Sequence, residues 1–414
     1  MNTTRLISQA LAAALALGAA GVPAAALETQ TLCDLQVLGG QYFFQGERGA
    51  LNGNASGLFA SVLVLNDRWT LVPSVASRFQ GTKQVVDLVG AGTLFSQQMD
   101  HRIGVKGVYR RPESDWLFKP ALSYSVQLLK ETLDERWFAG LFDYRMIDLG
   151  FEAEYIYRDP YSVRAGVDYV YTHFPNYTSL ESQLALDFQG QPLARELVGD
   201  NVLDTHALMF SAALTVPLGR GLRAESGLSF TRQSYPQQPV VAGTGLLTGD
   251  NRADLITSFS TALDASWKAG REVRVAPRLG LAVANTVANQ NNYDAMRTEH
   301  QPGYYNSTEL KLEPEVRLLL GDPRQPVALR LGSSLSFRRY PHRRIQDASG
   351  TYLDETLRQN GWMFTATASY PMAPGFRLLF NLQHGKASSN QGFEQFYSYN
   401  YTATNYLIGF RYEH

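Results

Sequence analysis

The sequence lacks several features on which other folds depend. It contains one cysteine, Cys33, in 414 residues. A single thiol cannot form an internal disulfide, so no disulfide framework holds this chain together. Charged residues make up only 18% of the chain and the formal net charge is −1, whereas soluble proteins average about 25% charged residues. This balance gives no sign of nucleic-acid binding, and we expect no nucleic-acid partner.

Long hydrophobic runs are also scarce, because the only one lies at the start of the chain. Arg5 precedes an apolar run over residues 6–20, and Ala24–Ala26 offers a small-x-small cleavage site. The run is shorter than the roughly 20 apolar residues that span a bilayer. We therefore predict a cleaved secretory signal peptide over 1–26 and a single domain over 27–414. A mean hydropathy of −0.21, with no other long apolar run, excludes a helical membrane protein.

The chain is instead rich in aromatic residues and glycine. It has 22 Tyr, 21 Phe and 35 Gly, and aromatic residues make up 12% of the sequence. Export, abundant aromatics and few charges are typical of a β-barrel whose outer surface faces lipid. A soluble secreted enzyme of this length shares some of these numbers, so the periodicity must decide.

Apolar residues alternate with polar or small ones over most of the mature chain. In 327–338, the odd positions are Val, Leu, Leu, Ser, Leu and Phe, and the even positions are Ala, Arg, Gly, Ser, Ser and Arg. Similar alternation runs through 116–127, 222–231, 273–284 and 310–318. Segments of about ten residues exceed the usual 5–6 residues of globular strands and match tilted membrane-spanning strands. The pattern therefore predicts an all-β fold of transmembrane strands.

Short turns rich in Pro, Gly and Asp alternate with longer polar stretches. The short turns lie near 66–68, 112–115, 158–160, 218–221, 268–270, 321–323 and 371–375. The long stretches lie near 81–100, 131–143, 176–203, 237–252, 286–308, 340–358 and 388–396. Outer-membrane barrels have short periplasmic turns and longer extracellular loops. We therefore predict a transmembrane antiparallel up-and-down β-barrel.

The barrel is predicted to have about 16 strands, an even number that places both chain ends in the periplasm. The expected strands cover 34–46, 55–66, 69–80, 101–112, 116–130, 144–157, 162–175, 204–217, 222–235, 253–267, 271–286, 308–321, 325–339, 359–371, 376–387 and 397–413. The first two strands and 81–100 are the least regular. A further strand over 85–95 would change the total to 14 or 18.

The last ten residues have the pattern of a closing strand. Apolar and aromatic residues occupy the even positions, which are Tyr406, Ile408, Phe410 and Tyr412. Through its strand pattern, its turn asymmetry and this terminus, the mature chain resembles the bacterial outer-membrane β-barrel (porin-like) superfamily, without matching one named family. Barrels of that class usually end in Gly-x-x-Φ-x-aromatic, and here the final aromatic is replaced by His. The resemblance implies that Gly409, Phe410, Tyr412 and His414 form a membrane-insertion signal. It also implies the Gram-negative outer-membrane bilayer and the barrel-assembly machinery as partners.

Alternate residues of the predicted strands point inward. Among the charged residues that we place on this inner face, Arg and Lys outnumber Asp and Glu. The candidate selectivity residues are Arg274, Arg278, Lys311, Glu313, Glu315, Arg317, Arg330, Arg338, Arg102 and Lys106. Facing rows of charge set the selectivity of water-filled pores. Arg–Glu ladders can also fill the lumen of a closed barrel, which leaves a second interpretation open. Sixteen strands leave an aqueous channel, and this favours a pore.

The sequence contains no familiar catalytic or metal motif. None of its seven His lies in a His-Glu-x-x-His or comparable spacing, and no Gly-x-Ser-x-Gly elbow occurs. His173 and His384 fall on outward positions near extracellular strand ends, where pairing with a serine across strands stays open. We expect no enzyme activity, no cofactor and no metal.

Two functions remain after these exclusions. The leading interpretation is a porin-like channel for small hydrophilic solutes, which the basic interior predicts to be anionic. The alternative is the barrel component of an envelope-spanning machine for polysaccharide or protein export, or for motility or surface attachment. In that case the turns and loops would dock envelope-machine proteins. A homo-oligomer is compatible with the sequence.

Overall fold

The computed structural model describes residues 29–81, 85–86, 92–93, 97–130, 135–159, 161–177, 197, 199–219, 221–294, 297–394 and 399–414. The side chains of 47–51, 85–86 and 92–93 are outside that description. The predicted signal peptide over 1–26 also lies outside the described residues. Among the described ones, no helix is long and apolar enough to cross a membrane.

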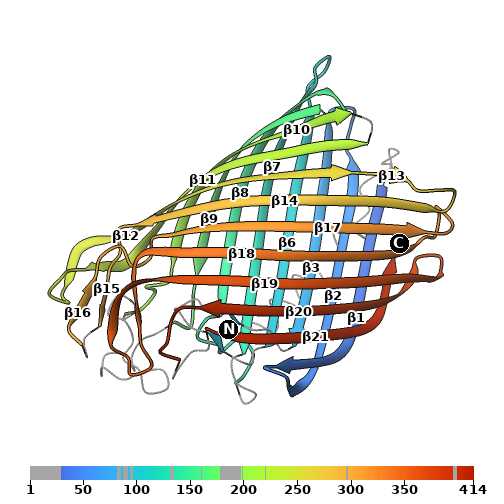
Figure 1. Cartoon of the computed structure of the whole chain (residues 1–414). Helices are drawn as coiled ribbons and strands as arrows, with labels where there is room; N and C mark the ends of the chain where they lie inside the picture. The colour runs from blue at the N-terminus through green and yellow to red at the C-terminus, as the bar shows by residue number, and fades with distance from the viewer. Residues whose placement is uncertain are drawn as a thin grey trace.

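Antiparallel strands pair in chain order around a closed barrel (Figure 1). They are β1 (Thr29–Phe44), β2 (Glu47–Val64), β3 (Trp69–Gly81), β6 (Gln97–Arg110), β7 (Trp116–Lys130), β8 (Tyr144–Arg158), β9 (Tyr161–His173), β10 (Thr205–Gly219), β11 (Leu222–Val241), β12 (Leu247–Ala265) with its continuation β13 (Trp267–Lys268), β14 (Val273–Ala288), β17 (Ser307–Leu320), β18 (Val327–Gln346), β19 (Tyr352–Ala373), β20 (Phe376–Ser389) and β21 (Tyr401–Glu413). The sheet has 17 segments, and because β13 continues β12 they make 16 strands. The predicted up-and-down barrel is confirmed.

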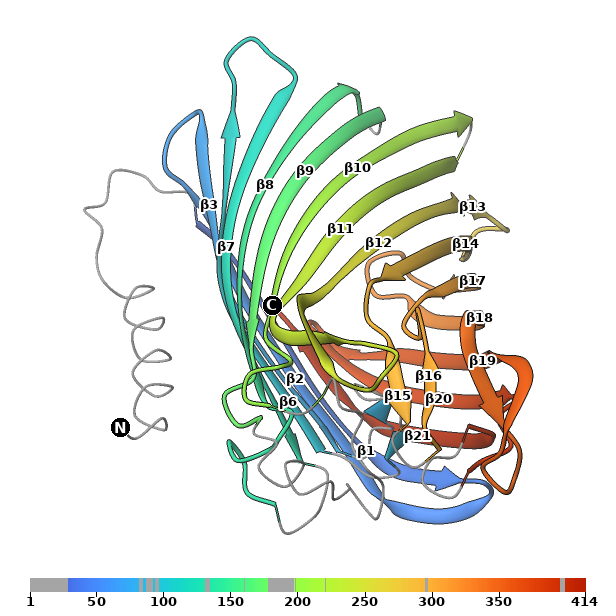
Figure 2. The same ribbon diagram turned by 90° about the vertical axis from the view of Figure 1, so that its left-hand side faces the viewer.

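The barrel closes where the first strand meets the last. β1 pairs with β21 from Asp34 opposite Glu413 to Phe44 opposite Ala403. In Figure 2, β3, β7 and β8 form the wall on the left, and β14, β17 and β18 form the wall on the right. Closure leaves no free sheet edge, so the strands satisfy their backbone hydrogen bonds within the sheet.

Two small hairpins lie outside the barrel sheet. β4 (Val85–Val86) pairs with β5 (Gly92–Thr93), and β15 (Asn292–Asp294) pairs with β16 (Glu299–Gln301). The stretch over 85–95 therefore adds no wall strand. The alternatives of 14 or 18 strands are wrong.

The predicted short turns all lie at one end of the barrel, which we call the short-turn end. At the opposite, long-loop end the expected loops over 237–252 and 340–358 are wrong. β11 and β12 continue to Val241 and from Leu247, and β18 and β19 continue to Gln346 and from Tyr352. Apolar and polar residues do not alternate regularly in these extensions, so the sequence pattern gave no sign that the strands continue.

The first hairpin is also longer than predicted. β2 begins at Glu47, eight residues earlier than expected, and only Gln45 and Gly46 separate it from β1. Both turn residues have positive φ, 51° and 83°. A two-residue turn of this kind matches the right-handed twist of paired strands. The strand therefore continues through a stretch that lacks clear alternation.

Apolar side chains share the outer face of the wall. One row of directly paired positions crosses five strands and consists of Leu228, Phe259, Val283, Leu310 and Phe337. Their exposed fractions lie between 37% and 44%. The opposite face carries the charged side chains. There, Arg102 on β6 reaches Asp148 on β8 at 3.2 Å across the intervening β7. Side chains two strands apart converge only on a concave surface, so the charged face is the inner one.

Candidate functional site: the inner wall

All ten predicted selectivity residues occupy inward positions. Arg102 and Lys106 lie on β6, and the other eight lie on β14, β17 and β18. The register sets Arg278 opposite Glu315 and Arg317 opposite Arg330. The sequence alternation therefore placed all ten residues on the inner face, and their role in selectivity stays a prediction.

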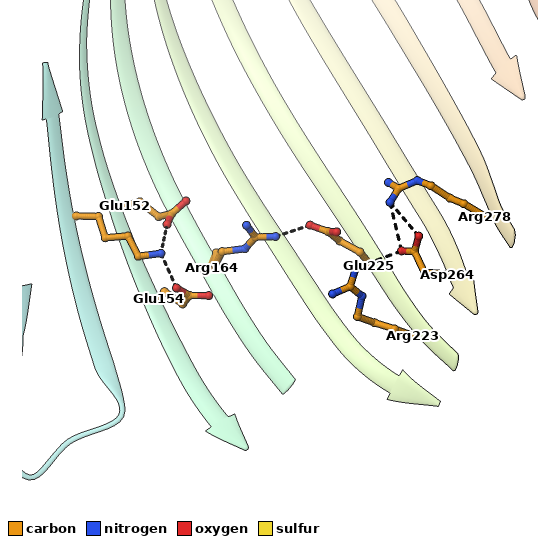
Figure 3. A network of polar contacts seen from close by, with 8 residues as sticks. Glu152, Glu154, Arg164, Arg223, Glu225, Asp264 and Arg278 are labelled. Atoms are coloured by element: carbon orange, nitrogen blue, oxygen red, sulfur yellow. Dashed lines mark hydrogen bonds and ion pairs between the residues drawn. The ribbon is translucent and has the colours of Figure 1, made fainter. Parts of the chain in front are cut away.

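A row of separate ion-pair groups crosses the inner wall near the short-turn end (Figure 3). It begins with Lys119 Nζ on β7, which donates to Glu152 Oε1 at 2.7 Å and to Glu154 Oε2 at 2.5 Å. Arg164 Nη2 on β9 then donates to Glu225 Oε1 on β11 at 2.5 Å. These charges lie on alternate positions close to the short turns, so neighbouring strands bring them to similar levels.

The same row continues toward β14, β17 and β18, with a third group centred on Asp264. Asp264 on β12 lies 3.5 Å from Arg223 Nη2 and 3.0 Å from Arg278 Nη1. Farther on, Arg330 Nε donates to Glu315 Oε1 at 2.7 Å. Opposite charges thus alternate from β7 to β18.

Two further ion pairs involve acids that the sequence reading missed. Arg338 on β18 contacts Glu309 Oε2 at 2.6 Å, and Arg411 on β21 contacts Asp34 on β1 at 2.7 Å. Asp148, the partner of Arg102, was missed as well. Each of these acids is an even number of residues from other inward positions of its strand, and this spacing is the sequence signal that identifies it. The inner wall is therefore less basic than predicted.

Some inner bases have no carboxylate partner within the described chain. Among the predicted selectivity residues they are Lys106, Arg274 and Arg317, none of which lies within ion-pair distance of a described carboxylate, and Arg317 also faces Arg330 across the β17–β18 pair. Glu313 on β17 is likewise without an ion-pair partner in the part of the chain that the structure describes. The unpaired charges on the inner wall of β14 and β17 are thus mostly positive.

Several of the paired arginines remain accessible to solvent, whereas Lys119, Glu154 and Glu309 are only 14–15% exposed. Arg330 is 59% exposed, Arg102 55%, Arg223 47% and Arg278 45%. Exposed ion pairs contribute only about 0–1 kcal/mol each to stability. The pairs hold the charges in position on the wall more than they stabilise the fold.

A pocket of about 450 Å³ lies on the inner wall across β1, β2, β3, β6, β7 and β8. Its polar lining includes Asp34, Arg78, Asp100, Arg102 and Gln127. Gln127 Nε2 donates to Asp100 Oδ1 at 2.7 Å. The pocket offers both donors and acceptors to a hydrophilic solute.

Arginines and tyrosines pack together at the long-loop end. Arg252 lies between the rings of Tyr235 and Tyr305, at 4.3 and 4.2 Å from their centroids, and forms a two-point contact with Asp254. Arg343 lies 4.4 Å from the ring centroid of Tyr304. Cation–π contacts of this kind stabilise the hairpin extensions.

The histidines considered for catalysis have partners other than serine. His173 Nδ1 contacts Asp204 Oδ2 at 2.7 Å, and His384 Nδ1 contacts Thr404 Oγ1 at 2.8 Å. A serine–histidine contact does occur elsewhere on the outer face, between Ser77 Oγ and His101 Nδ1 at 3.0 Å. A nucleophilic serine needs a base that a third group orients, and no hydrogen bond in the described ranges gives His101 one. No cluster of three or more potential metal ligands occurs among the described residues.

The predicted insertion signal lies at the end of the β1–β21 pairing that closes the barrel, which we call the seam. Phe410 and Tyr412 face outward and are 47% and 40% exposed. Gly409 faces inward, beside the Val37 carbonyl of β1. His414 exchanges backbone hydrogen bonds with Cys33 at 2.8 and 2.9 Å. The signal residues are therefore built into the wall, and their recognition by assembly machinery stays a prediction.

No family model matches the chain, and no curated protein matches its sequence. Similar solved structures include outer-membrane-expressed OmpT of Vibrio cholerae, with 13% identity, a TM-score of 0.44, and coverage of 95% of this chain and 99% of that chain. They also include OccAB3 of Acinetobacter baumannii, with 8% identity, a TM-score of 0.45, and coverage of 93% and 100%. A third is described as a bacterial polysaccharide outer membrane secretin, with 8% identity, a TM-score of 0.41, and coverage of 93% and 98%.

Proposed function

We propose that this protein is a channel of the bacterial outer membrane for small hydrophilic solutes. The observation that carries the proposal is the exposure of the inward guanidinium groups, which reaches 59% at Arg330. A lumen packed shut by its ladders would bury these groups. A charged and accessible inner wall supports passage of water and polar solutes.

The outer face supports placement in a membrane. Above the short turns, it carries aromatic side chains such as Trp69, Trp116, Tyr157 and Tyr370, all at least 36% exposed. Neighbouring rings touch, with centroids 5.0 Å apart for Trp69 and Tyr109. Aromatic belts of this kind lie at the headgroup level of a bilayer. The rows of Leu, Val and Phe between the two rims would then face hydrocarbon.

We further propose a preference for anions. The ion pairs cancel much of the inner charge, yet Lys106, Arg274 and Arg317 keep no carboxylate partner in the described chain. Positive charges on a wall of low dielectric constant raise the local anion concentration. The preference should be moderate, because the inward carboxylates of Glu313 and Asp168 also have no ion-pair partner in the described chain.

Single-channel recording in a planar bilayer tests the proposal. The purified protein should conduct, and a KCl gradient should displace its reversal potential toward that of chloride. A conducting protein that prefers cations would contradict the anion preference alone. A correctly folded barrel that never conducts would contradict the channel and favour the export or scaffold alternative.

A further inference from the structure

The outer face of the barrel carries charge of one sign and at one end. Its charged ladder positions are all basic and all lie toward the long-loop end. They are Lys130, Arg145, Arg232, Arg339, Arg358 and Lys386. Among the described side chains, no Asp or Glu occupies an outward position of the regular ladder. Such a distribution differs from the mixed charge of the inner wall.

The outer bases also differ from the inner ones in their partners. Most inner bases contact a carboxylate, as Lys119 and Arg164 do. Within the described ranges, no carboxylate pairs with Arg145, Arg232, Arg339, Arg358 or Lys386. A cation beside hydrocarbon is costly unless a counter-charge accompanies it. For these five bases, the described side chains supply no such counter-charge.

Three of the outer bases form one patch, the β18–β20 patch, which consists of Arg339, Arg358 and Lys386. Arg339 on β18 is directly opposite Arg358 on β19, and Lys386 on β20 is directly opposite Trp362. All three bases are exposed. Like charges directly opposite each other on a sheet destabilise it. An anion between Arg339 and Arg358 would reverse that effect.

Apolar side chains adjoin the patch on the side toward the barrel centre. Phe337 and Trp362, one or two alternations below the two arginines, are 43% and 40% exposed. The outward positions of Asn360 and Ser388, paired with each other, add hydrogen-bond donors between them. Toward the barrel centre, the two arginines are followed first by Asn360 and Ser388 beside Phe337, and then by Trp362 beside Lys386. The wall thus offers a lipid two cations at its outer end and apolar rings, with a third cation beside them, nearer the barrel centre.

We propose that the β18–β20 patch binds the phosphate groups of a phosphorylated, multiply acylated lipid in the leaflet at the long-loop end. Guanidinium groups bind phosphate oxygens at two points, so Arg339 and Arg358 hold one phosphate together. Lys386 adds a third charge, and the acyl chains lie on Phe337 and Trp362. The proposal depends on the membrane placement in the proposed function, and it is independent of conduction.

Native mass spectrometry of the delipidated protein in detergent tests this assignment. The probe is a hexa-acylated diglucosamine lipid with two phosphates, compared with the same lipid after removal of both phosphates. The wild type should retain the phosphorylated form selectively. Each base near an anionic lipid surface contributes roughly fivefold to binding, so R339Q/R358Q/K386Q should lose about 100-fold in affinity.

The matched control is R68Q/R111Q/R324Q, which removes three exposed bases from the short turns at the opposite end. It should bind the phosphorylated lipid like the wild type, and both variants should keep heat-modifiable migration in SDS gels. Equal retention of the two lipids by the wild type would overturn the proposal. So would equal losses in both triple variants, or displacement of the lipid by inorganic phosphate at equal concentration. A protein that binds the lipid without conducting would refute only the channel.

Discussion

The guanidinium group of Arg164 on β9 lies 2.5 Å from the carboxylate of Glu225 on β11, across the inner face of β10. The contact follows from curvature, because a concave wall brings side chains two strands apart within reach. Both side chains are about one-third exposed, at 31% and 37%. The pair is therefore better suited to placing charge in the lumen than to stabilising the barrel.

Separating the two charges should change ion selectivity more than stability. Glu225→Gln leaves Arg164 without its partner and should shift the reversal potential toward chloride, whereas Arg164→Gln should shift it toward potassium. The free energy of unfolding should change by less than about 1 kcal/mol in either variant. Reversal potentials and urea unfolding measure the two effects. Shifts of the same sign in both variants would contradict this role.

The two faces of one strand should tolerate charge differently. Leu331 on β18 faces outward, because it is directly opposite the outward residues Val316 and Ala366. Ser334, three residues later on the same strand, faces inward. An Arg at mid-depth on the lipid face costs about 2–4 kcal/mol. Leu331→Arg should therefore lower the folded fraction in heat-modifiability gels, and Ser334→Arg should not. Equal tolerance would mean that the faces are exchanged, as a slip of one residue would do.

The inner bases fall into two classes that mutation should separate. R274Q/R317Q removes bases without carboxylate partners and should move selectivity toward neutral. R278Q/R330Q removes bases that hold Asp264 and Glu315. It releases Glu315 and leaves Asp264 only its longer contact with Arg223, so selectivity should move farther toward cations. Reversal potentials of the two double variants, which lose equal charge, give the comparison. Identical shifts would show that only the number of bases matters.

The fold could be predicted from the sequence largely because one pattern repeats. Alternation such as that over 327–338 places each side chain on a face, and it identified all ten inner-wall candidates. It failed over 237–252 and 340–358, where polar strands extend beyond the apolar belt. The sequence could not predict which charges pair, because a contact such as Arg164–Glu225 depends on strand stagger and curvature. That Arg145, Arg232, Arg339, Arg358 and Lys386 have no carboxylate partner in the described chain likewise emerges only from three-dimensional neighbours.

A buried carboxyl group should make the loop cluster above β7–β10 sensitive to pH. Asp143 is 2% exposed beside the cluster of Phe174, Tyr177, Leu197, Val202 and Leu203. Burial raises the pKa of Asp143 from 3.8 to about 6, although the backbone N–H groups of Leu129 and Gly140 favour its charged form. The stabilisation is therefore complete below about pH 3.8 and is lost as pH rises through about 6.

The expected result is weaker protection of this loop cluster at pH 8 than at pH 5. Hydrogen exchange at the amides of Leu129 and Phe174, corrected for intrinsic rates, measures it. Leu129 N–H donates to Asp143 Oδ1 at 2.7 Å, so it reports on the group directly. Asp143→Asn cannot ionise and should abolish the difference. Protection that rises with pH in the wild type would refute the assignment.

The last prediction follows from the close approach of the β1 and β21 backbones at the seam. A Cβ on Gly409 would lie 1.9 Å from the Val37 carbonyl oxygen, and a Cβ on Gly40 would lie 1.9 Å from that of Tyr406. Gly39, the next residue along β1, has nothing within 4 Å of its Cβ position. Any side chain at Gly40 or Gly409 must therefore push β1 and β21 apart, whereas one at Gly39 meets open space.

Gly40→Ala and Gly409→Ala should each destabilise the closed barrel by about 1–3 kcal/mol, the usual cost of overpacking, and Gly39→Ala should be nearly neutral. Refolding into detergent, followed by urea unfolding and gel mobility, measures this without assembly machinery. That design separates packing from signal recognition, because Gly409 belongs to the predicted insertion signal and Gly40 does not. If Gly409→Ala refolds normally in detergent but fails to assemble in cells, then recognition, not packing, requires the glycine. If Gly39→Ala proves as damaging as Gly40→Ala, the seam is not the close contact that the register describes.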